Sequence, residues 1–209
     1  MVAVGCLSGC NQQMAPEASI KLKKGSSVRV VSAGGSDWTA KFGDKPAAVF
    51  PLEKGEAVYQ LVPPKTDTLF LSGQGNKKAI PLSMESEGGY TFLCVPEAGS
   101  IAVHRIDSKP TKALTDTQYQ VFNFADKEAT LEIGGESETV AAGSTGNVKS
   151  AKSLSLTVKG KVGDQALTPL TTDLRSETTY HVFVYTSGGK PKVGLINTNP
   201  PTRAAGMSQ

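Results

Sequence analysis

The sequence of 209 residues is poor in the side chains on which most catalytic and metal sites depend. It has two histidines, three cysteines and one tryptophan, and aromatic residues make up 6% of it. The two histidines, His104 and His181, lie far apart, so none of the usual spacings of zinc ligands is present. No apolar run approaches the roughly 20 residues of a membrane-spanning helix. We therefore expect no metal, no cofactor and no transmembrane helix.

A surplus of one charge is also missing. Lysine and arginine number 22 against 19 aspartates and glutamates, which leaves a net charge of +3. The only adjacent basic residues are the pairs Lys23-Lys24 and Lys77-Lys78. A nucleic-acid-binding domain concentrates its basic residues in a patch or stripe, so the sequence predicts no nucleic-acid partner. Its 38% hydrophobic and 20% charged content is that of an ordinary folded protein.

Motifs for nucleophilic catalysis are absent as well. A Ser-His-Asp hydrolase needs a histidine beside its nucleophile, and both histidines fall in strand-like segments, where we interpret them as structural. The nucleophile-elbow pattern Gly-x-Ser-x-Gly does not occur. Ser144 comes nearest to it, but the segment Gly143-Ser144-Thr145-Gly146 predicts a β-turn with no following helix. We expect a protein that is not an enzyme; an esterase or acetyltransferase using Ser144 with a histidine stays as an alternative.

The N-terminus carries a lipoprotein pattern. Leu7-Ser8-Gly9-Cys10 fits the bacterial lipobox, in which the signal peptide is cut before a cysteine that receives the lipid. Only nine residues precede Cys10 and none is basic, whereas a working signal has a positive n-region and about 7–15 apolar residues. We expect the true start to lie upstream, or the sequence to be clipped. Residues 1–19 are predicted to be a signal and tether, and an arbitrary apolar leader is the alternative.

The same pattern predicts where the protein is found. A protein lipidated on Cys10 is anchored to a membrane rather than spanning it, and we expect it in the bacterial periplasm, on the outer membrane. Cys6 would leave with the signal peptide, so Cys94 would be the only free thiol. Cys94 lies in a strand pattern on the same face as Tyr90 and Phe92, where a small buried thiol is the default.

What the sequence does contain is a duplicated β pattern. The aromatic and β-branched segments 90–95 and 180–185 each close a unit that opens with its own strand, at 28–31 and 119–122. Val28 and Tyr90 are 62 positions apart, and Tyr119 and Tyr180 are 61 apart. A period of roughly 90 residues is too long for a solenoid repeat and suits a pair of domains.

The segments between these strands indicate the fold class. They are short, have turn signals every 8–12 residues or so, and show no helical periodicity, which is typical of β-sandwiches. We predict an all-β protein of two tandem immunoglobulin-like or carbohydrate-binding-module-like β-sandwich domains, at residues 20–107 and 113–198, with a loose tail at 199–209. Trp38 borders a glycine-rich loop and has only Ala129 as its counterpart. It is our candidate contact for carbohydrate or a partner, with a place in the core as the alternative.

Six short segments carry a resemblance to a known family: Val28-Arg29-Val30-Val31-Ser32, Ala40-Lys41-Phe42-Gly43, Tyr90-Thr91-Phe92-Leu93, Gln120-Val121-Phe122-Asn123, Ile133-Gly134 and Tyr180-His181-Val182-Phe183. Two sandwich units with these strands, behind an export signal, resemble the periplasmic alginate O-acetylation accessory protein F family. The resemblance covers nearly the whole chain after the tether. It marks no active-site residue that can be transferred.

The resemblance implies a non-catalytic role. In such systems a membrane O-acyltransferase exports acetyl groups, and separate periplasmic proteins place them on the polymer. The chain would then be an accessory or adaptor protein that binds other components of the O-acetylation machinery, or the polysaccharide. A related exopolysaccharide system fits as well as alginate. The competing hypothesis is a structural or adhesive surface lipoprotein with immunoglobulin-like domains.

Overall fold

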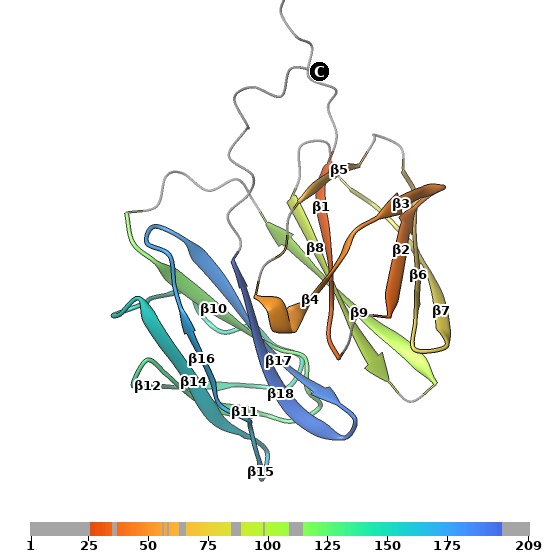
Figure 1. Cartoon of the computed structure of the whole chain (residues 1–209). Coiled ribbons are helices and arrows are strands. Elements are labelled where there is room, and N and C mark those ends of the chain that lie inside the picture. Colours follow the sequence, from red (N-terminus) through yellow and green to blue (C-terminus); the bar gives the residue numbers. More distant parts are fainter. Residues whose placement is uncertain are drawn as a thin grey trace, which may run out of the picture.

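The computed structural model describes residues 26–34, 37–55, 57, 59–62, 66–84, 89–97, 99–108 and 115–197 (Figure 1). Strands make up most of these residues, and their one helical element is the 3₁₀ turn η1 (Leu52–Lys54). The predicted all-β class is confirmed. Cys10 and the predicted tail lie outside the described residues. Within the described part, no helix has the length and apolar character needed to cross a membrane.

Residues 26–108, here called the first half, form two sheets. Sheet A has the order β4-β1-β8-β9, with β5 pairing the start of β1. Its strands are β1 (Ser26–Ser32), β4 (Val49–Pro51), β5 (Gln60–Val62), β8 (Gly89–Glu97) and β9 (Ser100–Ser108). Sheet B has the order β3-β2-β6-β7. Its strands are β2 (Trp38–Phe42), β3 (Lys45–Ala47), β6 (Thr68–Gly73) and β7 (Asn76–Pro81).

Residues 115–197, the second half, repeat this arrangement. Sheet C has the order β13-β10-β17-β18. Its strands are β10 (Gln118–Asn123), β13 (Lys149–Ser150), β17 (Thr179–Ser187) and β18 (Lys190–Asn197). Sheet D has the order β12-β11-β14-β15, with β16 also pairing β14. Its strands are β11 (Ala129–Ile133), β12 (Glu136–Val140), β14 (Ser155–Val162), β15 (Gln165–Ala166) and β16 (Leu170–Asp173).

The duplicated sequence pattern has a counterpart in the strand pairing. In each half the opening strand runs parallel to the closing strand. Val28 of β1 pairs with Tyr90 of β8, and Tyr119 of β10 pairs with Tyr180 of β17. These are the positions that the sequence spacing aligns. Sheet A therefore corresponds to sheet C, and sheet B to sheet D.

Each half has a hydrophobic cluster between its two sheets. In β2 the side chains of Trp38, Ala40 and Phe42 are buried, whereas Thr39 and Lys41 are exposed, because successive side chains of a strand point to opposite faces. The first cluster contains Val28, Val30, Trp38, Ala40, Phe42, Val62, Leu69, Leu71, Tyr90, Phe92, Cys94 and Ile101. The second includes Tyr119, Val121, Ala129, Leu131, Ile133, Val140, Leu156, Val158, Val162, Tyr180, Val182 and Val184.

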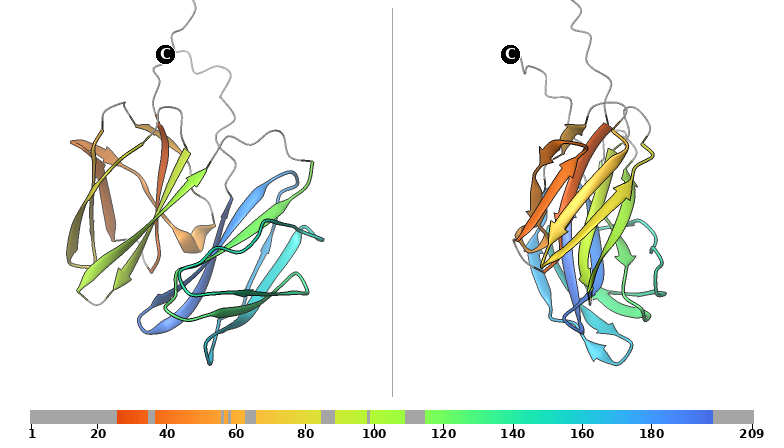
Figure 2. Two further views of the ribbon diagram at one scale, coloured as in Figure 1. Left: turned by 180° about the vertical axis from the view of Figure 1, so that it is seen from behind. Right: turned by 90° about the vertical axis from the view of Figure 1, so that its right-hand side faces the viewer.

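A third hydrophobic cluster joins the two halves. It contains Val31, Ala33, Leu52, Ala57, Leu93, Val95, Ile106, Phe122, Phe183, Tyr185 and Ile196. Most of these side chains come from the outward faces of sheets A and C, with Leu52 from η1 and Ala33 and Ala57 from adjoining loops, so the two sheets pack against each other. Figure 2 shows the halves side by side with β8, β9, β17 and β18 in the middle. We call this contact the junction.

The junction explains why the segments 90–95 and 180–185 are apolar without alternation. Sheets A and C are covered on both faces, by their own partner sheet and by each other. All the residues from Gly89 to Val95 of β8 and from Tyr180 to Tyr185 of β17 are accordingly buried. Strands with two buried faces are expected to be continuous hydrophobic runs.

Candidate functional site

Both histidines lie in the junction. His181 of β17 is 7% exposed, and its ring meets the ring of Phe122 edge-on at a centroid distance of 4.7 Å. His104 of β9 stacks on Phe124 of the second half at 4.0 Å. Each imidazole thus packs against a phenylalanine ring, which is the structural role that the sequence indicated.

Burial favours the neutral form of both imidazoles. It lowers the pKa of His181 to about 3, and the positive charge of Arg29 contributes in the same direction. Burial also lowers the pKa of His104, with Glu97 opposing this shift and Lys78 adding to it. A general base works best with a pKa near the operating pH. His181 does not meet this requirement.

Ser144 lies in an exposed turn rather than beside a base. Its Oγ donates a hydrogen bond to the carbonyl oxygen of Ala142 at 3.4 Å, and its carbonyl oxygen accepts one from the backbone N–H of Asn123. In the described part of the chain neither histidine bonds to the Ser144 hydroxyl. Across those same residues, no group of three or more His, Cys, Asp or Glu side chains could hold a metal ion.

Trp38 lies in the first-half core. Its side chain is 6% exposed, and its ring covers Gly73, its pairing partner on β6. A Cβ added to Gly73 would lie 2.5 Å from the Trp38 ring, so glycine is needed there. In the second half the corresponding pair is Ala129 and Val162, where the small residue stands in place of Trp38 and the larger one in place of Gly73. A ring in this position has no free face to stack on a sugar, which corrects the contact role expected for Trp38 in favour of the core alternative.

A buried arginine is the most unusual polar residue of the junction. Arg29 of β1 is 0% exposed. Its Nε donates to Thr91 Oγ1 at 2.8 Å, its Nη1 donates to the carbonyl oxygen of Asn197, and its guanidinium lies 4.5 Å from the centroid of the Tyr59 ring. A buried charge needs hydrogen bonds to replace its water; Nε and Nη1 have them, whereas the buried Nη2 has no partner among the described residues. Arg29 therefore binds the end of β18 to sheet A.

A groove of about 430 Å³ is lined by residues of both halves. Leu52, Glu53 and Gly55 of the η1 segment form one side, and residues of β16 and β18 form the other. Its polar lining comes from Glu53, Thr171, Thr172, Asp173, Arg175 and Asn197. Ligand sites of proteins typically enclose about 300–1,000 Å³. Carboxylate, guanidinium and amide groups on an apolar wall could hold a hydroxyl-rich unit such as a sugar.

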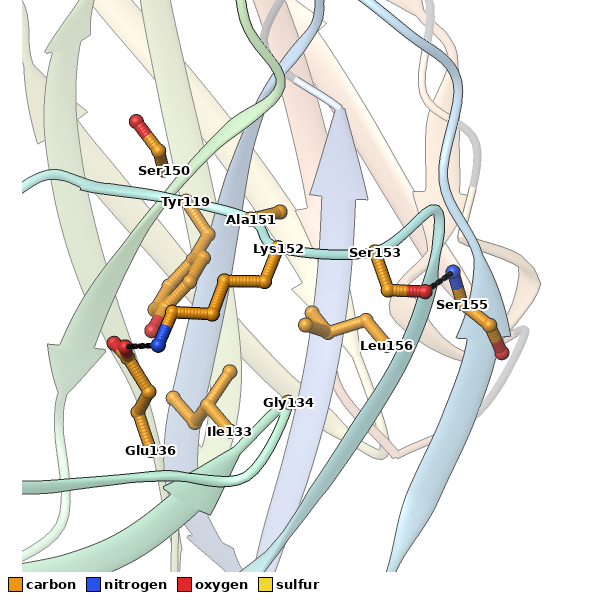
Figure 3. Close-up of a pocket in the computed structure, with 10 residues that line it drawn as sticks. All are labelled: Tyr119, Ile133, Gly134, Glu136, Ser150, Ala151, Lys152, Ser153, Ser155 and Leu156. Atoms are coloured by element: carbon orange, nitrogen blue, oxygen red, sulfur yellow. Dashed lines mark hydrogen bonds and ion pairs between the residues drawn. The ribbon is translucent and has the colours of Figure 1, made fainter.

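A second, shallow pocket lies at the open edge of the second half (Figure 3). The Lys152 ammonium pairs with Glu136 at 2.5 Å beside the hydroxyl end of Tyr119. Burial and then the nearby Glu138 and Glu136 raise the pKa of Tyr119 to about 12. The cavity of about 10 Å³ has room for about one water molecule. It is too small for a ligand.

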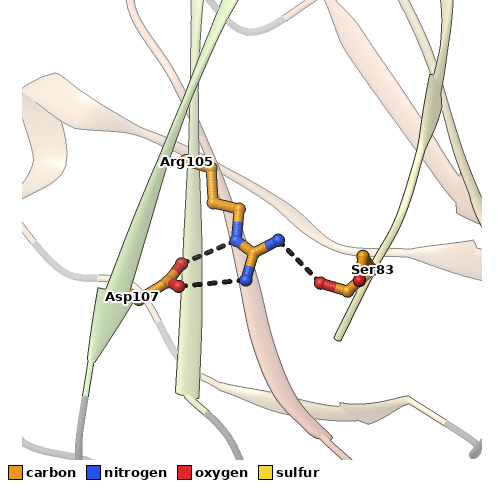
Figure 4. Close-up of polar contacts among 3 residues, drawn as sticks. All are labelled: Ser83, Arg105 and Asp107. Atoms are coloured by element: carbon orange, nitrogen blue, oxygen red, sulfur yellow. Dashed lines mark hydrogen bonds and ion pairs between the residues drawn. The ribbon is translucent and has the colours of Figure 1, made fainter. Parts of the chain in front are cut away.

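One polar cluster of the first half is a structural brace (Figure 4). Arg105 donates to both carboxylate oxygens of Asp107, at 2.6 and 3.0 Å, and to the carbonyl oxygen of Ser83 at 2.6 Å. Its guanidinium also lies 4.6 Å from the centroid of the Tyr90 ring. These contacts join β9 to the segment that follows β7.

Sequence patterns predict neither the burial of Arg29 nor the groove. Arg29 stands among valines in the opening strand, and an arginine is mostly exposed in folded proteins. The groove unites Glu53 with Asp173 and Arg175, which lie more than a hundred positions further along the chain. No local pattern predicts such a meeting. No protein-family model matches the chain, and no curated protein matches it.

Proposed function

We propose that the protein is a non-catalytic periplasmic adaptor for exopolysaccharide O-acetylation, of the alginate type or a related one. Its two tandem immunoglobulin-like or carbohydrate-binding-module-like β-sandwich domains would occupy residues 20–107 and 113–198, behind a lipid on Cys10. The observation that carries the proposal is the duplicated sheet pair, whose opening and closing strands run parallel at matching positions in both halves. The family that the sequence resembles implies this architecture.

The junction suits the task of an adaptor. A protein that brings partners together must hold its binding surfaces in a fixed relative orientation. The apolar cluster between sheets A and C, with Arg29 hydrogen-bonded to the end of β18, supplies that rigidity. A preorganised surface loses less conformational entropy on binding. Partner proteins from the O-acetylation machinery would dock on the faces that the junction leaves uncovered.

The groove supports the second mode of binding in this proposal, contact with the polymer. Its volume of about 430 Å³ and its mixture of Glu53, Asp173, Arg175 and apolar groups fit a hydroxyl-rich sugar unit. The groove carries two carboxylates against one guanidinium, so a densely anionic stretch of polymer would be repelled. A neutral sugar unit would fit better.

The packing of the halves favours the adaptor over the structural or adhesive spacer. A spacer gains length when its domains are joined end to end. Here sheets A and C are packed face to face, with Phe122 and Phe183 of one half buried against Leu93 and Val95 of the other. This arrangement shortens the molecule and stiffens it.

The purified protein can be tested with the machinery itself. We expect the mature chain to bind a periplasmic component of the O-acetylation system in a titration, and to raise acetyl transfer to the polymer when it is added to the reconstituted components. A chain that is folded but neither binds a component nor changes transfer would refute the adaptor role. A Ser144→Ala variant should act like the natural chain, which also tests the esterase alternative.

A further inference from the structure

The outward surface of sheet B differs from the other exposed sheet surface of the molecule in what it presents. By register its side chains are Thr39, Lys41, Pro46, Thr68, Phe70, Ser72, Lys77, Ala79 and Pro81. We call this surface the Phe70 face. Phe70 is 46% exposed and is the only aromatic among the exposed large hydrophobic residues of the described part.

The face has apolar side chains at its centre and two lysines, Lys41 and Lys77, next to them. Pro46, Lys41, Phe70 and Ala79 form one row across the four strands. Lys77 lies one row away, opposite Ser72. By register the strands of the face carry no carboxylate, and the carboxylate of Asp67, just before β6, accepts a hydrogen bond from Thr68 Oγ1 at 3.1 Å at the end of the face. The face therefore combines exposed apolar surface with lysines that lack a counter-charge on it.

The second half provides an internal comparison. Glu132 of β11 corresponds to Lys41 of β2, since each precedes a buried residue and a glycine turn, Ile133-Gly134 and Phe42-Gly43. Lys41 is paired in register with Phe70, whereas Glu132 is paired with Lys159. Lys159 and Glu132 form an ion pair at 2.9 Å. The face of sheet D thus neutralises its own charge at the positions where sheet B presents an aromatic ring and an unneutralised lysine.

From this contrast we infer that the Phe70 face is a docking surface for a partner protein that offers an apolar pocket to Phe70 and an acidic rim to Lys41 and Lys77. Protein interfaces have this anatomy, with an apolar core and a polar rim whose charges select the partner. The inference rests on the proposed adaptor function in so far as the partner is a component of the O-acetylation machinery.

The geometry favours a protein rather than a polysaccharide as the partner, and contact through the face of the sheet rather than strand addition at its edge. The face is a sheet surface with one aromatic residue, whereas small ligands and sugar units bind in concave sites. Pro46 on β3 and Pro81 and Lys77 on β7 occupy the edge strands, where proline and lysine block the addition of another strand. Neighbouring strands lie about 4.8 Å apart, and side chains on one face of a strand repeat about every 7 Å along it, so the Phe70 face covers only a few hundred Å². Such an area suits a transient contact.

Site-specific photo-crosslinking in cells that make the exopolysaccharide tests this inference. Phe70 is replaced by p-benzoylphenylalanine in the full chain, and Lys159 is replaced in the same way as the matched control on sheet D. Both positions are exposed, so we expect the substituted proteins to fold, and circular dichroism checks that they do. We expect one discrete protein adduct from position 70, identified by mass spectrometry, and none from position 159. The Lys41→Glu/Lys77→Glu double variant should reduce its yield about tenfold.

The outcomes separate this inference from the proposed function. An adduct with an O-acetylation component supports both. An adduct with another protein that depends equally on Lys41 and Lys77 supports the docking face and removes support for the O-acetylation role. The inference is overturned by an absent adduct, by equal adducts from both positions, by an adduct insensitive to the lysine reversals, or by attachment to polysaccharide or to a second copy of this chain. In those cases the acetyl-transfer assay still decides the adaptor role.

Discussion

Leu52 of η1 lies directly over Gly194 of β18, and this contact ties the first half of the chain to the second. A Cβ on Gly194 would lie 2.5 Å from the Cδ2 of Leu52, closer than real contacts allow. Leu52 is almost completely buried and belongs to the cluster that joins the halves. The glycine in β18 therefore provides the space that the leucine fills.

This contact predicts a coupling between two substitutions. Leu52→Ala should destabilise the protein by about 2–5 kcal/mol through the cavity it leaves, and Gly194→Ala by about 1–3 kcal/mol through overpacking. In the double variant the new methyl group enters the vacated space, so the loss should be smaller than the sum of the two. Urea unfolding of the four proteins measures this. Strict additivity would show that the two residues do not pack as described.

A second prediction concerns Gly73 under Trp38. Gly73→Ala places a methyl group where the indole lies, so we expect a loss of about 1–3 kcal/mol from overpacking. The exposed Gly75, in the following turn, has open space but a positive φ of 80°, so Gly75→Asn, which tolerates that conformation, is a gentler control. Tryptophan fluorescence should shift in the first variant and stay unchanged in the second. An unshifted spectrum and unchanged stability in Gly73→Ala would contradict the packing.

Acid should weaken the protein through His181. Its pKa is lowered to about 3 in the fold, whereas an unfolded chain leaves it near 6.5. The unfolded state binds the proton first as the pH falls, so stability is complete above about pH 6.5 and is lost between 6.5 and 3. The groups facing the imidazole are Arg29 of β1, which opposes the added proton, and the rings of Phe122 and Phe183.

Urea titrations at pH 7.5 and pH 5 measure this effect. The natural chain should lose about 2 kcal/mol more than His181→Phe over this range, at about 1.4 kcal/mol per pH unit below 6.5. His104 is present in both proteins and its contribution cancels. Equal losses in the two proteins would mean that His181 is not buried as a neutral group.

The thiol of Cys94 should be unreactive in the folded protein. Cys94 is fully buried, and burial raises its pKa to about 12, while the reactive form of cysteine is the thiolate. We expect no measurable alkylation of Cys94 by iodoacetamide at pH 8 in native buffer, and rapid alkylation in 6 M guanidinium chloride. Peptide mass spectrometry locates the label. Alkylation under native conditions at the unfolded rate would place Cys94 at an accessible site.

Much of the fold could be predicted because strand alternation is a local signal and the duplicated spacing is visible along the sequence. The alternation from Trp38 to Phe42 fixes which side chains face the core, and the structure has that pattern. The same alternation places Trp38 and Phe42 on the buried face, so only the neighbouring glycine-rich loop favours a contact role for Trp38. The repeated spacing aligned Val28 with Tyr119 correctly.

The sequence pattern does not predict the junction or the composition of the exposed faces. The unbroken apolar runs at 90–95 and 180–185 carried the signal of two buried faces, but not which surface covers the second face. Arginine is mostly found exposed, yet Arg29 is buried, where it donates hydrogen bonds to Thr91 and to the backbone of the distant Asn197. The contrast between Phe70 and Lys159 depends on cross-strand register. Hydrophobic alternation predicts which face of a sheet a residue lies on, but not which residue it pairs with on the next strand.

The most direct test of the adaptor role is the acetyl content of the exopolysaccharide in a deletion strain. We predict that acetyl groups are lost from the polymer, that the natural gene restores them, and that Cys10→Ala does not, because the adaptor then loses its membrane anchor. Restoration by both forms would keep the adaptor role and make the lipid dispensable. Unchanged acetyl content in the deletion strain would contradict the account and leave the structural or adhesive lipoprotein as the better reading.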